Sequence, residues 1–187
     1  IGYRATGLQY IEFADASTLH VWNTTEGSPL SSNSVSAILP HESGRTLVGT
    51  YGGGVNIVSL TGDTEVFSVG DNHVIFLHRT ADGTILVGTE SGTYQLDTHT
   101  GHAVKLTLLE SHDSSQTKPV IWDIVDTESG DMWLATMHHG LFVSRDEDPK
   151  AISERTFIPV PESAKLCSTA YAIEVDSDGY IWCSTNS

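Results

Sequence analysis

The chain has 187 residues, of which 39% are hydrophobic and 18% are charged; this composition fits one substantial globular domain and excludes a disordered chain. Its 24 acidic and 9 basic residues give a formal net charge of −15 at pH 7, which disfavours nucleic acid and anionic membrane surfaces as partners because like charges repel. Two cysteines are too few for a disulfide framework.

A block of 16 residues recurs four times without a gap, at 35–50, 74–89, 121–136 and 170–185. Each block has a turn glycine, and a threonine closes the block six residues later. The glycines are Gly44, Gly83, Gly130 and Gly179, and the threonines are Thr50, Thr89, Thr136 and Thr185. The glycines are spaced by 39, 47 and 49 residues, so the block is fixed and only the connections change length. Insertions confined to loops are typical of repeated structural units.

Each block predicts a β-hairpin: an apolar run, a polar turn in which glycine supplies a positive φ, and a second apolar run. Consecutive apolar residues such as Ile85-Leu86-Val87 indicate strands that are covered on both faces. A glycine and a third strand follow, and the extended segments at 64–67 and 156–158 supply a fourth. Four strands in about 40–50 residues predict an all-β fold, a β-propeller segment of four-stranded antiparallel blades with about four repeats. The alternative is a parallel β-helix, whose repeats are shorter.

In chain order, the pattern predicts a partial β-propeller over 1–187, with the end of a blade at 1–22, blades at 35–67, 74–107 and 121–158, and the start of a blade at 170–187. Ile1-Gly2-Tyr3 aligns with Val48-Gly49-Thr50, so the chain opens in the second strand of a blade. Because a sheet cut in this way exposes strand edges, we expect a piece of a longer, larger propeller; a closed ring of four blades is the alternative. The opening residues do not resemble a signal peptide, and no run approaches the ~18 apolar residues that span a bilayer.

The segment at 27–38 contains Leu30-Ser31-Ser32-Asn33 and is followed by Gly44, by Leu47-Val48-Gly49-Thr50 and by Gly54-Val55. This order resembles the two-component-regulator propeller repeat, whose pattern is a Leu-Ser-Ser-Asn lead-in, an apolar strand, Asp-Gly, Leu-Trp-hydrophobic-Gly-Thr and Gly-Leu. Trp133 and Trp182 match the tryptophan of that pattern, whereas Leu47 and Leu86 stand there in the first two copies. The lead-in is clear only before the first copy.

The resemblance implies the periplasmic, ligand-sensing ectodomain of a bacterial membrane sensor, often a seven-bladed propeller. In that family a transmembrane helix joins the propeller to a histidine kinase or a GGDEF-type diguanylate cyclase. The implied partners are a small ligand, often a carbohydrate fragment, and a second receptor chain or further blades. One alternative is a protein-interaction scaffold. The other is a propeller lyase or glycosidase, which would need two converging carboxylates, and Asp123 is the one candidate.

The sequence has no nucleophile elbow, His-Glu-x-x-His motif, phosphate loop or paired-cysteine motif, so we predict no catalytic residue, metal site or cofactor. Gly52-Gly53-Gly54 is predicted to be a turn between strands because no lysine or helix follows. Residues 176–179 are predicted to form a hairpin turn rather than a calcium loop. Cys183 aligns with apolar residues of the other copies, which predicts a buried thiol, and a disulfide with Cys167 is left open.

One column varies inside the fixed frame and holds Ser36, Ile75, Trp122 and Tyr171. The next column holds Ala37, Phe76, Asp123 and Ala172. Both begin the predicted innermost strand, near the mouth of a propeller's central channel. Aromatic rings stack on sugars and an unpaired carboxylate accepts their hydrogen bonds. Trp122, Asp123 and Tyr171 are therefore predicted to bind a ligand, with Tyr51 and His138 as further candidates in loops. The alternative is that Trp122 and Tyr171 only pack between blades.

Overall fold

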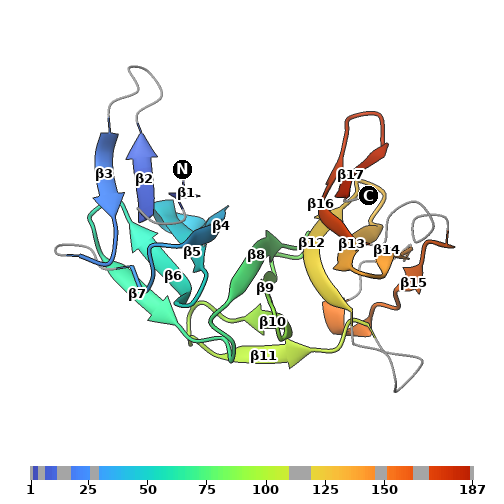
Figure 1. Cartoon of the computed structure of the whole chain (residues 1–187), viewed down its shortest axis with the longest axis horizontal. Helices are drawn as coiled ribbons and strands as arrows, with labels where there is room; N and C mark the ends of the chain where they lie inside the picture. The colour runs from blue at the N-terminus through green and yellow to red at the C-terminus, as the bar shows by residue number, and fades with distance from the viewer. Residues whose placement is uncertain are drawn as a thin grey trace. The chain divides into compact units, whose positions relative to one another are not determined.

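The computed structural model describes residues 2–3, 7–11, 18–25, 30–109, 119–145, 151–161 and 169–185. The predicted all-β fold is confirmed: the strands form separate small antiparallel sheets (Figure 1). Short 3₁₀ turns lie at Glu42–Gly44 and Ile152–Glu154. By contacts between Cα atoms the chain divides into two compact units. Unit 1 comprises Ile1–Leu77 and Leu96–Val104, and unit 2 comprises His78–Gln95 and Lys105–Ser187.

Three sheets have four strands each, in chain order across the sheet, as a propeller blade requires. The first has β4 (Val35–Pro40), β5 (Arg45–Thr50), β6 (Gly54–Ser59) and β7 (Thr64–Phe67). The second has β8 (Val74–Arg79), β9 (Ile85–Thr89), β10 (Gly92–Leu96) and β11 (Ala103–Leu106). The third has β12 (Val120–Asp126), β13 (Met132–Met137), β14 (Gly140–Ser144) and β15 (Ile158–Pro159).

Two further sheets have fewer strands. The first part of the chain forms a three-stranded sheet of β1 (Gly2–Tyr3), β2 (Gly7–Ile11) and β3 (Thr18–Trp22). The last part forms a two-stranded sheet of β16 (Ala170–Val175) and β17 (Ile181–Thr185). Tyr3 opposes Gly7 in the first of these sheets, as Thr50 opposes Gly54 in the first complete sheet. β1 therefore occupies the place of a second strand.

The hairpin register explains the fixed length of the repeated block. Its first residue pairs with its closing threonine, as Val35 does with Thr50 and Ala170 with Thr185. The predicted left-handed turn glycines are confirmed, since φ is +72° at Gly44, +87° at Gly83, +88° at Gly130 and +83° at Gly179. A side chain there would be strained.

The closing threonines form hydrogen bonds across the turn that follows them. The hydroxyl of Thr50 donates to the carbonyl oxygen of Gly54 at 2.9 Å, and that of Thr136 donates to Gly140 at 2.6 Å. Thr89 makes the same bond to Gly92 at 2.8 Å. All three threonines are buried, so the bond satisfies a hydroxyl that would otherwise lose its contact with water. The predicted turn at 52–54 is confirmed by this arrangement.

Each unit has an apolar core between neighbouring sheets. In unit 1 the buried cluster is Leu8, Trp22, Leu30, Val48 and Val58. In unit 2 the cluster is Ala135, Leu141, Ala170 and Ile173, with Val125, Trp133, Val160 and Ile181 packed against it. In unit 2, β13 and β14 of one sheet thus meet β16 of the next, and in unit 1, β2 and β3 meet β5 and β6 of the next. Neighbouring sheets therefore cover each other's faces, as propeller blades do.

Two sequence-based predictions need correction. The fourth strand of the third sheet is Ile158–Pro159, later than the expected 156–158, and proline is tolerated there because the strand lies at the sheet edge. Cys183 is exposed, whereas its equivalents Val48, Val87 and Leu134 are fully buried. Those residues lie on strands with a neighbour on each side, whereas β17 pairs only with β16 among the described strands. Cys167 lies outside the described residues.

Candidate functional site

The variable column of the sequence lies on β-bulges. The strand register shifts between Val35 and Ala37 in β4, between Ile121 and Asp123 in β12, and between Ala170 and Ala172 in β16. Ser36, Trp122 and Tyr171 are therefore the extra residues of three equivalent bulges. A bulge redirects a side chain and is common beside binding sites, and sequence spacing alone gave no sign of it.

Trp122 and Tyr171, both in unit 2, form an edge-to-face aromatic pair. Their ring centroids lie 5.2 Å apart, and the ring planes meet at 87°, the geometry that aromatic quadrupoles favour. Tyr171 is 41% exposed, whereas Trp122 is half-buried. The indole Nε1 of Trp122 is buried and has no hydrogen-bond partner among the described residues. The pair thus packs between adjacent first strands and still presents aromatic surface to solvent.

Asp123 is not the unpaired carboxylate that the sequence suggested. Its Oδ1 accepts from the backbone N–H of Ile124 at 2.9 Å, and its Oδ2 accepts from the backbone N–H of Ile173 at 3.0 Å. Burial raises the pKa of Asp123 above its ordinary value, and these two hydrogen bonds oppose the shift. The bond to Ile173 satisfies a backbone donor of the neighbouring strand β16, so this carboxylate ties β12 to β16.

A second carboxylate ties β12 on its other side. Asp126 Oδ2 lies 2.9 Å from Nε2 of His78 in β8, and both side chains are mostly buried. Within unit 2, β12 is therefore linked by one carboxylate to β8 and by another to β16. A shift of β12 would change both links.

His138 lies in the turn between β13 and β14 and is the one described non-glycine residue with a positive φ, +66°. Its equivalent in the first complete sheet is Gly52, with φ +92°; a left-handed non-glycine residue persists only where its surroundings enforce it. The backbone N–H of His138 donates to Thr169 Oγ1 at 3.1 Å, and Nδ1 lies 3.3 Å from the same oxygen. His138 is thereby fastened next to the strand that carries Tyr171.

Tyr51 belongs to a separate cluster in unit 1. Its ring lies 4.6 Å from that of His73, edge to face, and Tyr51 is 46% exposed. His73 Nδ1 lies 3.0 Å from Asp71 Oδ1, so the carboxylate orients the imidazole. Sequence reasoning missed His73 and Asp71. The polar run Asp71-Asn72-His73 directly before the apolar strand at Val74 was the available signal.

The structure therefore brings Trp122, Asp123 and Tyr171 together, fastens His138 beside them, and places Tyr51 in its own cluster. Within the described ranges, no group of three or more metal-ligating side chains comes together. No helix in the same part of the chain is long and apolar enough to cross a membrane.

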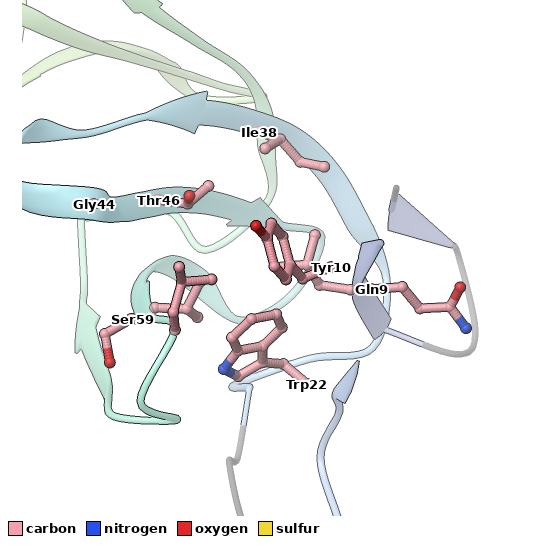
Figure 2. A pocket seen from close by; sticks show the side chains of 10 residues that line it. Gln9, Tyr10, Trp22, Ile38, Gly44, Thr46 and Ser59 are labelled. Carbon is pink, nitrogen blue, oxygen red and sulfur yellow. The ribbon is translucent and has the colours of Figure 1, made fainter. Parts of the chain in front are cut away.

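Unit 1 also holds a pocket of about 170 Å³ that sequence reasoning did not foresee. It lies between β2 and β3 on one side and β4 to β6 on the other. Figure 2 shows Tyr10 and Trp22 facing the strands that carry Ile38 and Thr46. Leu8, Val58 and Leu60 complete its apolar wall.

No protein-family model matches this chain, and no curated protein matches it. Solved structures do resemble it. The extracellular domain assigned to the hybrid two-component system BT3049 of B. thetaiotaomicron has a TM-score of 0.71 at 21% identity, over 98% of this chain and 23% of that chain. The extracellular domain assigned to the one-component system BT4673 of B. thetaiotaomicron has a TM-score of 0.74 at 18% identity, over 98% and 24%.

A propeller enzyme is also similar. Virginiamycin B lyase from Staphylococcus aureus has a TM-score of 0.58 at 17% identity, over 81% of this chain and 49% of that chain. This chain spans about a quarter of the two sensor domains. At these identities the likeness concerns the fold, and the chain is thus an all-β propeller segment that resembles the extracellular domains of bacterial sensor systems.

Proposed function

We propose that this chain is part of the ligand-sensing, periplasmic region of a bacterial membrane receptor, with a histidine kinase or a diguanylate cyclase as output. The similarity to extracellular domains of two-component and one-component systems supports this proposal. The observation that carries it is the Trp122–Tyr171 pair on adjacent bulges, because the edge-to-face contact holds Tyr171 so that its exposed face can stack on a planar or sugar-like ligand.

The ligand class that this platform favours is a carbohydrate fragment. A sugar ring would stack on the exposed face of Tyr171, which the half-buried ring of Trp122 holds in place by its edge-to-face contact. His138, fastened through Thr169, would supply a further polar contact. Asp123 acts as a positioning residue, since both of its oxygens accept backbone N–H groups.

The mechanism would be non-covalent. A ligand on the aromatic pair contacts β12 and β16 together, and β12 is tied to its neighbours through Asp123 and Asp126. Binding would therefore favour one spacing of these strands over another. A ligand shifts a receptor between two states only by the difference in its affinity for them. The ligand would therefore act by favouring one packing of the blades over another.

Titration calorimetry against a panel of neutral and acidic oligosaccharides tests the proposal. We expect one class to bind, and Tyr171→Ala and Trp122→Phe each to weaken binding by roughly tenfold or more, since buried aromatic contacts dominate binding energies. Tyr180→Ala is the matched control, because Tyr180 is an exposed turn residue on β17's side of the same hairpin. Binding that is unchanged in both site variants would contradict the assignment.

Two other functions have distinct outcomes in the same experiment. A lyase or glycosidase would turn the polysaccharide over; we consider it less supported because the carboxylate of Asp123 is already engaged by two backbone donors. A protein-interaction scaffold would bind a partner protein instead. Its affinity for that partner would be unchanged by substitutions at Trp122 and Asp123 but lowered by changes in a surface loop.

A further inference from the structure

Unit 2 contains a cavity of about 150 Å³ that the proposed function does not use. Its lining comes from the start of β10, the end of β11 and the start of β12. Apolar residues, Leu108 and Ile121 among them, alternate with hydroxyl-bearing residues such as Thr93 and Thr107. Neither residue of the aromatic pair lines it, so the cavity is a separate place in this unit.

Lys105 is the one described cation in this lining, and three contacts hold its side chain in place. Its Nζ donates to the carbonyl oxygen of Ser91 at 2.6 Å and lies 5.7 Å from the centre of the Tyr94 ring, within the range of a cation–π contact. Its Cε packs over Gly92, where an added Cβ would lie 2.9 Å from it. An ammonium has three donors, and among the described residues only Ser91 accepts from this one. The remaining N–H groups of an ordered cation can therefore donate to a ligand.

The equivalent place in the first complete sheet is filled by the chain itself. Gly54 begins β6 as Gly92 begins β10, and both glycines have a positive φ. The backbone N–H of Gly54 donates to the Asn72 carbonyl oxygen at 3.1 Å, and an added Cβ at Gly54 would lie 3.2 Å from Asn72 Oδ1. Beside Gly92, the side chain of Lys105 and the cavity stand instead. The cavity is therefore not a general consequence of the repeat.

We propose that this cavity binds a small molecule with a single carboxylate or sulfate group, which accepts hydrogen bonds from the Lys105 ammonium. Such charge-assisted bonds are stronger than neutral ones. A cavity of about this volume holds a six-membered ring, and Leu108 and Ile121 contact the apolar face of that ring. The chain has a net charge of −15 and repels polyanions, so a ligand with one anionic group is favoured.

Titration calorimetry of the whole chain tests this site with galacturonate and with galactose sulfated at its primary hydroxyl, against galactose as the neutral counterpart. We expect the acids to bind and galactose to bind at least about tenfold more weakly, because it lacks the charge-assisted bonds. The two acids distinguish a carboxylate from a sulfate as the preferred group. No binding of either acid at millimolar concentration would overturn the proposal, as would equal affinity for the acids and galactose.

Lys105→Met keeps the aliphatic stem over Gly92 and removes the charge. It should weaken binding of the acids by about tenfold, and circular dichroism should show an unchanged fold because Lys105 is exposed. Arg145→Gln is the matched control, since Arg145 is exposed and follows β14, at the other end of the third sheet from the start of β12. Equal affinities in Lys105→Met and the wild type would contradict the assignment.

The second charged residue of the lining gives an effect of opposite sign. Glu90 carries the same charge as the ligand, and like charges repel. Glu90→Gln should therefore strengthen binding of the acids by roughly threefold and leave the weak binding of galactose unchanged. Weaker binding of the acids in Glu90→Gln would contradict an anion site beside this residue.

Tyr171→Ala separates this site from the aromatic pair. Binding of the acids in the cavity should be unchanged in this variant, because Tyr171 does not line the cavity. Loss of acid binding in Tyr171→Ala but not in Lys105→Met would overturn the inference. Acid binding that depends on Lys105, in a chain that binds no oligosaccharide through Tyr171, would support this site and contradict the proposed function.

Discussion

Two interfaces between sheets, one in each unit, use equivalent positions of the repeat but are held in different ways. In unit 2 the interface is filled, and Trp133 and Val125 pack against Leu141, Ala170 and Ile173. In unit 1 the equivalent space contains a pocket of about 170 Å³. Trp133, which shares its column of the repeat with Leu47, Leu86 and Trp182, packs at the filled interface, and no described residue of that column lines the pocket of unit 1.

The unit 1 interface is held by polar bonds from the segment that precedes β4. Asn33 Oδ1 accepts from the backbone N–H of Thr24 at 2.8 Å, and the backbone N–H of Gly7 donates to the Asn33 carbonyl at 3.3 Å. The backbone N–H of Ser31 donates to Asn56 Oδ1 at 2.9 Å. The Leu-Ser-Ser-Asn lead-in therefore has a physical role, as a polar clasp that joins the three-stranded sheet of β1, β2 and β3 to β6.

The largest expected effect is at the filled interface. Trp133→Ala should lower the free energy of unfolding by about 3 kcal/mol, because it removes the residue that fills the space between two sheets. Trp182→Ala is the matched control: the same column, but exposed, with an expected loss of less than about 1 kcal/mol. Denaturant titration of both variants makes the measurement. Equal losses would show that packing of Trp133 between the sheets contributes no more to stability than an exposed tryptophan does.

The polar clasp of unit 1 should contribute nearly as much. Asn56 is fully buried, and its amide bonds both the backbone and the hydroxyl of Ser31. Asn56→Ala should therefore cost about 2 kcal/mol, because it removes two hydrogen bonds of a buried side chain to Ser31. Ser68→Ala, at an exposed residue, serves as the control in the same titration. A loss under about 0.5 kcal/mol would mean that the clasp does not hold this interface.

Filling the pocket should have a smaller effect of opposite sign. Thr46→Ile introduces at the pocket wall the residue type that Ile181 supplies in unit 2. We expect a gain of about 1 kcal/mol from added apolar burial, measured as a rise in the denaturant midpoint. The same change at Thr84, the residue that precedes β9, should give no gain. A destabilised Thr46→Ile chain would show that the pocket cannot accept added volume.

The smallest effect concerns pH at the filled interface. Burial raises the folded-state pKa of Asp123 above 3.8, so the unfolded chain releases this proton first. As pH rises from 3.8 through the folded-state pKa, ionisation of Asp123 lowers stability, and at lower pH that loss is absent. The stability of the wild type relative to Asp123→Asn should therefore fall as pH rises across this window. A relative stability that rises instead would contradict the raised pKa.

The sequence was sufficient for the repeat, the turn glycines and the hairpins, because each depends on local backbone chemistry. The Gly44 and Gly179 turns need a positive φ that glycine adopts without strain, and that requirement is visible in the spacing of residues. The apolar runs likewise predicted strands that are covered on both faces.

The candidate site was only half predictable. Trp122 and Tyr171 stood out as a variable column, but the bulges that redirect them depend on pairing across strands. The partner of Asp123 is a backbone N–H 50 residues away, and no local pattern reveals such a bond. The pocket in unit 1 and the exposure of Trp182 depend on which strands lie beside them, which single-residue properties do not encode.

A double-mutant cycle between Trp133 and Ile173 tests most directly whether the tryptophan that packs between the sheets of unit 2 holds those sheets together. Unfolding free energies would be measured for the wild type, Trp133→Leu, Ile173→Ala and the double variant. The account predicts a coupling of about 1 kcal/mol, as expected for side chains in one packed cluster. A coupling within about 0.3 kcal/mol of zero would place the two residues in independent environments and contradict it.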